Sequence, residues 1–209
     1  MDQLSNGNGR FSIMRKVRNA ATALIVALSL LLAGAPAQAA RDRTLDLFFT
    51  HTGEKLKITY KRNGRFIPSA LTELNRFLRD WRRNESTKVD PELFDLLWQI
   101  QQGVGQGRTI HVVSAYRSPA TNNMLRSRSR GVAKFSQHMA GKACDFYIPG
   151  VSTAEIRKAA FKLQVGGVGF YPTSRTPFVH LDTGSVRSWP RMTRSQLLAV
   201  FPDGKTVHL

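Results

Sequence analysis

"SQHMAGKACDFYIPG" (residues 136–150) predicts a loop that runs into a strand. His138 lies in the predicted loop, and seven residues later Asp145 lies in the strand KACDFYI. In a strand, Ala143 and Asp145 face the same side. Gly141 and Ala143 are small, and we expect them to leave room for whatever the histidine and the carboxylate share. A histidine and a carboxylate that converge on one point suit a cation such as zinc.

A catalytic zinc site uses three protein ligands and keeps a fourth position open, so a third ligand is needed. The chain has five histidines. His51 lies in a predicted turn, His208 is the penultimate residue, and His111 alternates with apolar residues inside a predicted strand. His180 lies in FVHLD, a predicted strand that can pair antiparallel with KACDFYI. We therefore choose His180, although the spacing by itself is a weak motif and structural histidines are the alternative.

Cys144 is the only cysteine of the chain, which excludes an intramolecular disulfide bond. Two interpretations are open, a small buried hydrophobe and a catalytic thiolate. Alternation along the strand turns Cys144 to the face opposite Asp145, and this favours the buried interpretation.

The N-terminal residues 1–39 have the order of a secretory signal peptide. Basic residues precede an apolar run from Ala20 to Leu32, and the small-x-small sequence AQA follows. The run is shorter than the roughly 20 residues that a spanning helix needs, although an uncleaved anchor is the alternative. Translation can also begin at Met14. We expect a mature protein from about Ala40, without a stable membrane span, in the periplasm or cell envelope of a Gram-negative-type bacterium.

The charge is strongly positive, +17 for the whole chain. Residues 1–39 hold four of its 31 basic and one of its 14 acidic residues, so the rest carries +14. Such a domain is attracted to polyanions. The basic residues are scattered without the interleaved aromatics of a nucleic-acid module, so we expect no nucleic-acid partner and an anionic envelope polymer instead.

The pattern of elements predicts an α+β fold, in which helices pack on a small antiparallel sheet. We expect an N-terminal β-hairpin region over 40–67, a main region over 68–190 that forms one domain with the hairpin, and a C-terminal tail over 191–209. Strands are predicted within 44–60 (two), 108–118, 142–148, 166–172 and 178–182. Helices are predicted after Pro68 and over 91–102 and 152–163, a short helix or turn over 118–129, and a short capped helix in the tail.

Four motifs in order carry a family resemblance: SAYRSPATNNML, SQHMAGKACDF, GGVGFYP and FVHLDTGSVRSW. The second matches S-x-H-x-x-G-x-A-x-D, and the region from Leu45 to Trp189 resembles zinc peptidases similar to D-Ala-D-Ala carboxypeptidases and Hedgehog proteins, in the branch of murein endopeptidases similar to murein endopeptidase K. The resemblance implies a Hedgehog-like fold and a Zn²⁺-dependent hydrolase that cuts peptide cross-links between peptidoglycan peptide stems. The implied zinc ligands are His138, Asp145 and His180.

The resemblance also implies that Arg117, in AYRSP, binds the substrate carbonyl or the developing oxyanion, a role that a fixed guanidinium suits. One departure concerns the general base: carboxypeptidases of the wider group carry Glu-x-x-His, and Pro177 stands at that glutamate position here. Asp182 is the best substitute, because residues i and i+2 of a strand share a face. Shaping the DTG turn, or orienting His180, is an equally open role for Asp182. Tyr116 and Tyr171 are candidate substrate-binding residues.

Two other functions stay open at this point. One is a non-catalytic peptidoglycan-binding module of the envelope, and the other is a D,D-carboxypeptidase. We expect a monomer, and the sequence does not say whether 4-3 or 3-3 cross-links are cut.

Overall fold

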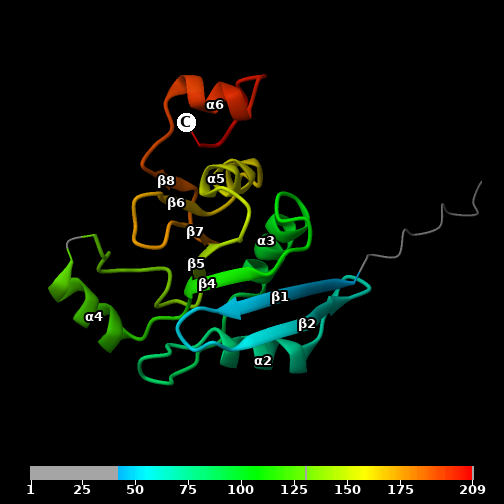
Figure 1. Cartoon of the computed structure of the whole chain (residues 1–209), viewed down its shortest axis with the longest axis vertical. Coiled ribbons are helices and arrows are strands. Elements are labelled where there is room, and N and C mark those ends of the chain that lie inside the picture. Colours follow the sequence, from blue (N-terminus) through cyan, green and yellow to red (C-terminus); the bar gives the residue numbers. More distant parts are fainter. Residues whose placement is uncertain (1–41, 130, 209) are drawn as a thin grey trace, which may run out of the picture. The chain divides into compact units, whose positions relative to one another are not determined.

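The computed structural model describes residues 42–129 and 131–208, whose strands form a single mixed sheet (Figure 1). The predicted signal peptide lies outside the described residues. In order across the sheet, the strands are β3 (Arg65–Phe66), β2 (Lys55–Arg62), β1 (Arg43–Phe49), β4 (Ile110–Ser114), β5 (Ala143–Tyr147), β7 (Phe178–Asp182), β6 (Gly167–Tyr171) and β8 (Arg187–Trp189).

The α+β class is confirmed, but the sheet is mixed and larger than expected. β1 pairs with β4 in parallel, and β6 pairs with β8 in parallel, while the other neighbours are antiparallel. Two helices intervene in the chain between β1 and β4, so the chain can return in the same direction. The short edge strands β3 and β8 were not predicted, because two or three residues carry no recognisable period.

The helices begin where the sequence places capping residues. They are α2 (Pro68–Phe77), α3 (Pro91–Gln102), α4 (Pro119–Arg128), α5 (Thr153–Lys162) and α6 (Arg194–Val200). The side chain of Asp90 accepts a hydrogen bond from the backbone N–H of Glu92 at the start of α3, and Ser152 and Glu155 form a capping box on α5. The helix predicted after Pro68 is α2, and it ends at Phe77 although apolar residues continue at helical spacing to Leu78 and Trp81.

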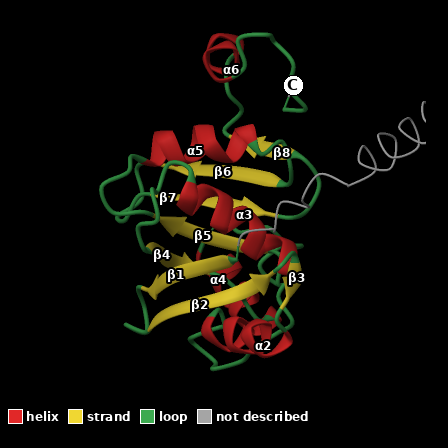
Figure 2. Cartoon of the chain, turned by 90° about the vertical axis from the view of Figure 1, so that its right-hand side faces the viewer, coloured by secondary structure: helices red, strands yellow, loops and turns green. Residues whose placement is uncertain are grey.

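One face of the sheet is covered by α3 and α5 (Figure 2). The side chains of β1 alternate, with Leu45, Leu47 and Phe49 fully buried in the core. Cys144 and Phe146 of β5 join the same core, which confirms that the thiol is buried. Asp145, between them, faces the other side of the sheet, where the candidate site lies.

The C-terminal helix α6 adds buried side chains to the same core. In the described part of the chain, no helix combines the length and the apolar character needed to cross a membrane.

Candidate active site

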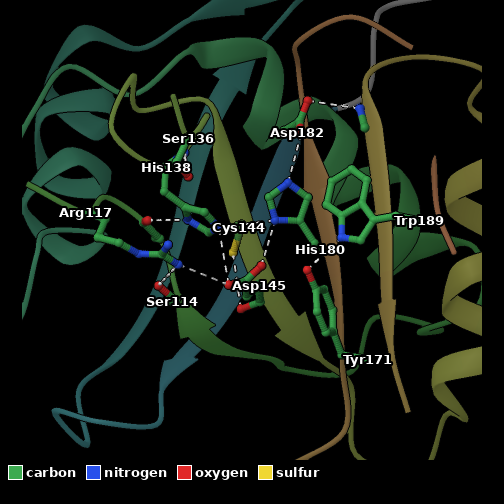
Figure 3. A network of polar contacts seen from close by, with 12 residues as sticks. Ser114, Arg117, Ser136, His138, Cys144, Asp145, Tyr171, His180, Asp182 and Trp189 are labelled. Carbon is green, nitrogen blue, oxygen red and sulfur yellow. Dashed lines mark hydrogen bonds and ion pairs between the residues drawn. The ribbon is translucent and has the colours of Figure 1, made fainter. Parts of the chain in front are cut away.

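Two neighbouring strands bring His180 and Asp145 together. They are directly opposite each other in the antiparallel pair of β5 and β7, and Asp145 Oδ1 lies 2.8 Å from His180 Nδ1. The loop before β5 adds His138, whose Nε2 lies 3.2 Å from His180 Nδ1 and 3.2 Å from Asp145 Oδ2. All three side chains are buried, and one ligand atom of each lies within 4.8 Å of the others (Figure 3).

The outer nitrogen of each imidazole is held by an acceptor. His138 Nδ1 lies 2.6 Å from the carbonyl oxygen of Ala115, and His180 Nε2 lies 2.8 Å from Asp182 Oδ2. A carbonyl and an ionised carboxylate can only accept, so both outer nitrogens carry the hydrogen. In the neutral rings, the inner nitrogens therefore present lone pairs to each other and to Asp145.

Three lone pairs that face one another repel unless a cation or a shared proton lies between them. Ligands of a tetrahedral zinc ion at 2.0–2.1 Å are about 3.3 Å apart, which is close to the 3.2 Å between the two inner nitrogens. Two imidazoles and a carboxylate, each fixed from behind, are also the ligand types that zinc prefers. These residues fit a zinc ion.

Burial and neighbouring charge act in opposite directions on these groups. Burial by itself would raise the pKa of Asp145, but His138 and His180 outweigh it and hold that pKa well below its usual range. Burial lowers the pKa of His138, against the opposing effect of Asp145. Burial would also lower the pKa of His180, but hydrogen bonds to Asp145 and Asp182 raise it.

Position 141 requires glycine for a different reason from the one expected. Its φ is +66°, and a Cβ there would lie 2.8 Å from the backbone carbonyl oxygen of Lys88. Gly141 is therefore required by its left-handed backbone and by the close approach of the segment before α3, and not by space beside the ligands.

The three ligands lie in a cavity of about 560 Å³ that opens to solvent. One wall is the segment after α4, including Phe135, which is 86% exposed. Tyr171, Phe178 and Trp189 also line the cavity, and the Tyr171 and Phe178 rings stack with centroids 4.5 Å apart. Of the two predicted substrate-binding tyrosines, only Tyr171 is among the described residues that line this cavity.

Tyr116 faces elsewhere. The backbone N–H of Tyr116 donates to the carbonyl oxygen of Leu78, just after α2, at 3.0 Å. Burial and the nearby carboxylates of Glu85 and Asp80 raise the pKa of its hydroxyl.

Arg117 reaches the ligands from the segment after β4. Its Nη2 lies 3.6 Å from Asp145 Oδ2 and 3.4 Å from Ser114 Oγ. The side chain is nearly buried, it lines the cavity, and its Nε has no hydrogen-bond partner among the described residues. A guanidinium with unused donors beside three metal-binding groups can bind a substrate oxygen.

Asp182 is directed to His180 and away from the cavity. Its side chain has 0% exposure, and it accepts from His180 Nε2, from the backbone N–H groups of Gly167 and Gly184, and from both terminal nitrogens of Arg187. Burial would raise the pKa of Asp182, but the hydrogen bonds from His180 and Arg187 hold it well below its usual range.

Comparison with known proteins bears directly on this geometry. The family model described as peptidoglycan L,D-endopeptidase MepK matches residues 37–189. The chain belongs to this family. It is 47% identical over 149 residues to peptidoglycan L,D-endopeptidase MepK of Escherichia coli K12, which covers 71% of this chain and 81% of that protein. It is 43% identical over 150 residues to the probable peptidoglycan L,D-endopeptidase MepK of Haemophilus influenzae, which covers 71% of this chain and 80% of that protein.

Membership of the MepK family confirms the resemblance to murein endopeptidases and makes the chain an enzyme, a metallopeptidase. The family match ends at Trp189 and so includes β8, the edge strand that carries Arg187 and Trp189. Both side chains line the cavity, and neither was assigned a role from the sequence. The available signal was the G-x-G spacing of GGVGFYP together with the R-x-W spacing of VRSW, which match in register in the parallel pair of β6 and β8.

Proposed function

We propose that this MepK-family enzyme is a zinc-dependent endopeptidase that hydrolyses L,D-peptide bonds in peptidoglycan and works in the periplasm after loss of its signal peptide. The observation that carries the proposal is the convergence of His138 Nε2, His180 Nδ1 and the Asp145 carboxylate in an open cavity. The L,D-bond is taken from the names of the relatives.

His138, Asp145 and His180 would hold the metal. When bound, zinc supplies Lewis acidity, which polarises a carbonyl and lowers the pKa of water towards neutrality. The protein contributes the fixed direction of each ligand, through the Ala115 carbonyl behind His138 and Asp182 behind His180.

Arg117 is proposed to bind the oxygen of the scissile carbonyl as negative charge develops on it. Its guanidinium is nearly desolvated and stands beside Asp145, so its charge is poorly screened by water. Preorganised donors of this kind stabilise the transition state more than the ground state.

Asp182 is proposed to orient His180 and not to act as the general base. A base must reach a proton in the cavity, whereas the Asp182 carboxylate has no exposed surface and already accepts from five donors. Its hydrogen bond keeps the proton of His180 on Nε2, which leaves Nδ1 free for the metal.

Peptide stems are proposed to bind along the wall that contains Tyr171. The Tyr171 oxygen accepts a hydrogen bond from Trp189 Nε1 at 2.6 Å, so its own hydrogen is free to point to a bound peptide. Tyr116 has no part in this wall. The charge of +14 after residue 39 supports attraction to the anionic polymers of the envelope.

Digestion of purified sacculi tests the proposal. The zinc-loaded mature protein is expected to bind one equivalent of zinc and to release muropeptides that mass spectrometry identifies as products of L,D-bond cleavage in 3-3 cross-links. Retention on sacculi without new muropeptides would indicate a binding module, and release of free D-alanine would indicate a D,D-carboxypeptidase. Products from 4-3 cross-links alone would contradict the L,D assignment.

A further inference from the structure

The edge strand β8 presents two side chains to the face of the sheet that carries the ligands. Arg187 and Trp189 are two residues apart, so both point to this face. In the parallel pair of β6 and β8, Arg187 is the register partner of Gly167, and Trp189 is the register partner of Gly169. Gly169 is in turn opposite His180 on β7, so a single row crosses Trp189, Gly169, His180 and Asp145.

The two glycines of β6 leave gaps through which the β8 side chains reach β7. A Cβ at Gly167 would lie 2.8 Å from the Arg187 guanidinium carbon and 2.4 Å from Asp182 Oδ2. A Cβ at Gly169 would lie 2.6–2.7 Å from three atoms of the Trp189 indole. Neither glycine has a positive φ, so it is the neighbouring side chains, and not the backbone, that exclude a larger residue.

Through the first gap, Arg187 binds Asp182 with both terminal nitrogens. Nη2 lies 2.6 Å from Asp182 Oδ2, and Nη1 lies 3.1 Å from Oδ1. A bidentate pair of this kind fixes the plane of the carboxylate. Asp182 Oδ2 is also the acceptor for His180 Nε2, so the plane that Arg187 sets decides where the imidazole points.

Through the second gap, Trp189 lies against the imidazole itself (Figure 3). The ring centroids of Trp189 and His180 are 4.9 Å apart at an interplanar angle of 51°. The hydrogen bond from Trp189 Nε1 to the Tyr171 hydroxyl at 2.6 Å holds the indole in place. The indole therefore packs against the imidazole and restricts its rotation.

We propose that Arg187 and Trp189 are positioning residues for the metal ligand His180. Both side chains extend from β8 past Gly167 and Gly169 of β6 and hold the imidazole in place, and we call this arrangement the brace. Arg187 fixes the outer nitrogen through Asp182, and Trp189 limits rotation of the ring. This inference rests on the metal site of the proposed function.

The first test measures zinc affinity and does not depend on peptidase activity. Full-length purified Arg187→Met, Arg187→Lys and wild-type protein are titrated with zinc against a chelating indicator, and the Co²⁺ absorption spectrum reports the geometry of the ligands. Removal of a group behind a ligating histidine typically lowers metal affinity by about 10–100-fold, and we expect a loss near the lower limit for Arg187→Met. Arg187→Lys keeps the positive charge but not the two parallel N–H donors of the guanidinium, and we expect its zinc affinity to lie between those of Arg187→Met and wild type.

Ser188→Ala is the matched control, because Ser188 lies between the two residues and its side chain faces the opposite side of β8. Its zinc affinity and its Co²⁺ spectrum should equal those of wild type. Circular dichroism of each metal-free variant establishes that the titrations compare folded proteins.

The second test is a double-mutant cycle at the Trp189 gap. Gly169→Ala forces the indole to move, and Trp189→Leu removes it, so each is expected to weaken zinc binding and to shift the Co²⁺ spectrum. The double variant should bind zinc as Trp189→Leu does, because the added methyl group then has space. Additive losses would show that Gly169 does not act through Trp189.

The outcomes separate this inference from the proposed function. Wild-type zinc affinity and an unchanged Co²⁺ spectrum in folded Arg187→Met and Trp189→Leu would overturn the brace and leave the metal site intact. If those variants do not fold, Arg187→Lys and Trp189→Phe decide in the same way. A wild-type protein that binds neither zinc nor cobalt would refute the proposed function itself, and the brace with it.

Discussion

The substitution Asp182→Asn separates the two roles that the sequence left open for this carboxylate. Asparagine has nearly the same shape, but an amide group replaces one oxygen. If the amide oxygen stays with the backbone N–H groups of Gly167 and Gly184, Nδ2 takes the position of Oδ2. Two donors, His180 Nε2 and Arg187 Nη2, then face a third donor.

The imidazole can relieve this conflict by moving its proton from Nε2 to Nδ1. That proton would then occupy the nitrogen that faces His138 and Asp145, so the ligand set is spoiled without loss of any ligand. Loss of a group behind a ligating histidine lowers metal affinity by about 10–100-fold, and a change of tautomer should produce a loss near the upper limit.

The stability of the metal-free protein should fall as well. A hydrogen bond to a charged group contributes about 1.5–3 kcal/mol, and the variant loses the one from Arg187 Nη2, while the one from His180 is replaced by a neutral hydrogen bond from Nδ2 to Nε2. The Arg187 side chain is 38% exposed, so hydrogen bonds to water compensate part of the stability that the loss of its contact with Oδ2 costs. We therefore expect the free energy of unfolding to fall by about 1–3 kcal/mol.

The assay combines zinc titration against a chelating indicator with urea unfolding of the metal-free protein and turnover on cross-linked muropeptides. Asp203→Asn is the control, because Asp203 is exposed and far along the chain from the ligands. One equivalent of zinc bound with wild-type affinity, together with lost turnover, would refute the orienting role and make Asp182 the base. Full activity with normal affinity would remove Asp182 from both roles.

Four further predictions follow from the contacts described above. His138→Ala and His180→Ala should each lose zinc and activity while staying soluble, and one equivalent of zinc retained in His138→Ala would disprove the ligand assignment. Arg117→Lys should lower kcat/KM by about 10²–10³-fold with a much smaller effect on zinc affinity, and equal losses in both would argue for a structural role. Cys144 has its pKa raised by burial and should react with a thiol reagent only in denaturant; rapid labelling of the native protein would contradict the packing. Asp90→Ala should cost about 2 kcal/mol of stability by removing both the α3 cap and the hydrogen bond from Thr183 Oγ1 to Asp90 Oδ2, with kcat unchanged when measured well below the unfolding temperature.

Much of the fold could be read from local patterns. Strand-forming runs bounded by turn residues located β1, β2, β4, β5, β6 and β7, and the capping residues Asp90 and Ser152 located the starts of two helices. These signals depend on residues that are neighbours along the chain, so no tertiary information is needed. Parallel pairing at β1–β4 and β6–β8 was missed, because a strand has the same alternation whichever direction its neighbour runs.

The candidate site was likewise predicted in part from local patterns, and in part it depends on tertiary contacts. The choice of His180 rested on the expectation that FVHLD pairs with KACDFYI, and the register of β5 and β7 gives that pairing, with Asp145 opposite His180. Tyr171 lines the cavity and Tyr116 is not among its lining residues, because spacing along the chain does not fix the direction in which a side chain points.

The sequence alone determined which residue types are available, which faces of each strand they share, and, through the family resemblance, the class of enzyme. Only the tertiary structure decided how Asp182 is used, because its five donors come from β7 itself, from β6, from the turn after β7 and from β8. The gaps at Gly167 and Gly169 have meaning only once β8 lies beside β6. Contacts between strands depend on register and on the space between side chains, and neither is written in the order of residues along one strand.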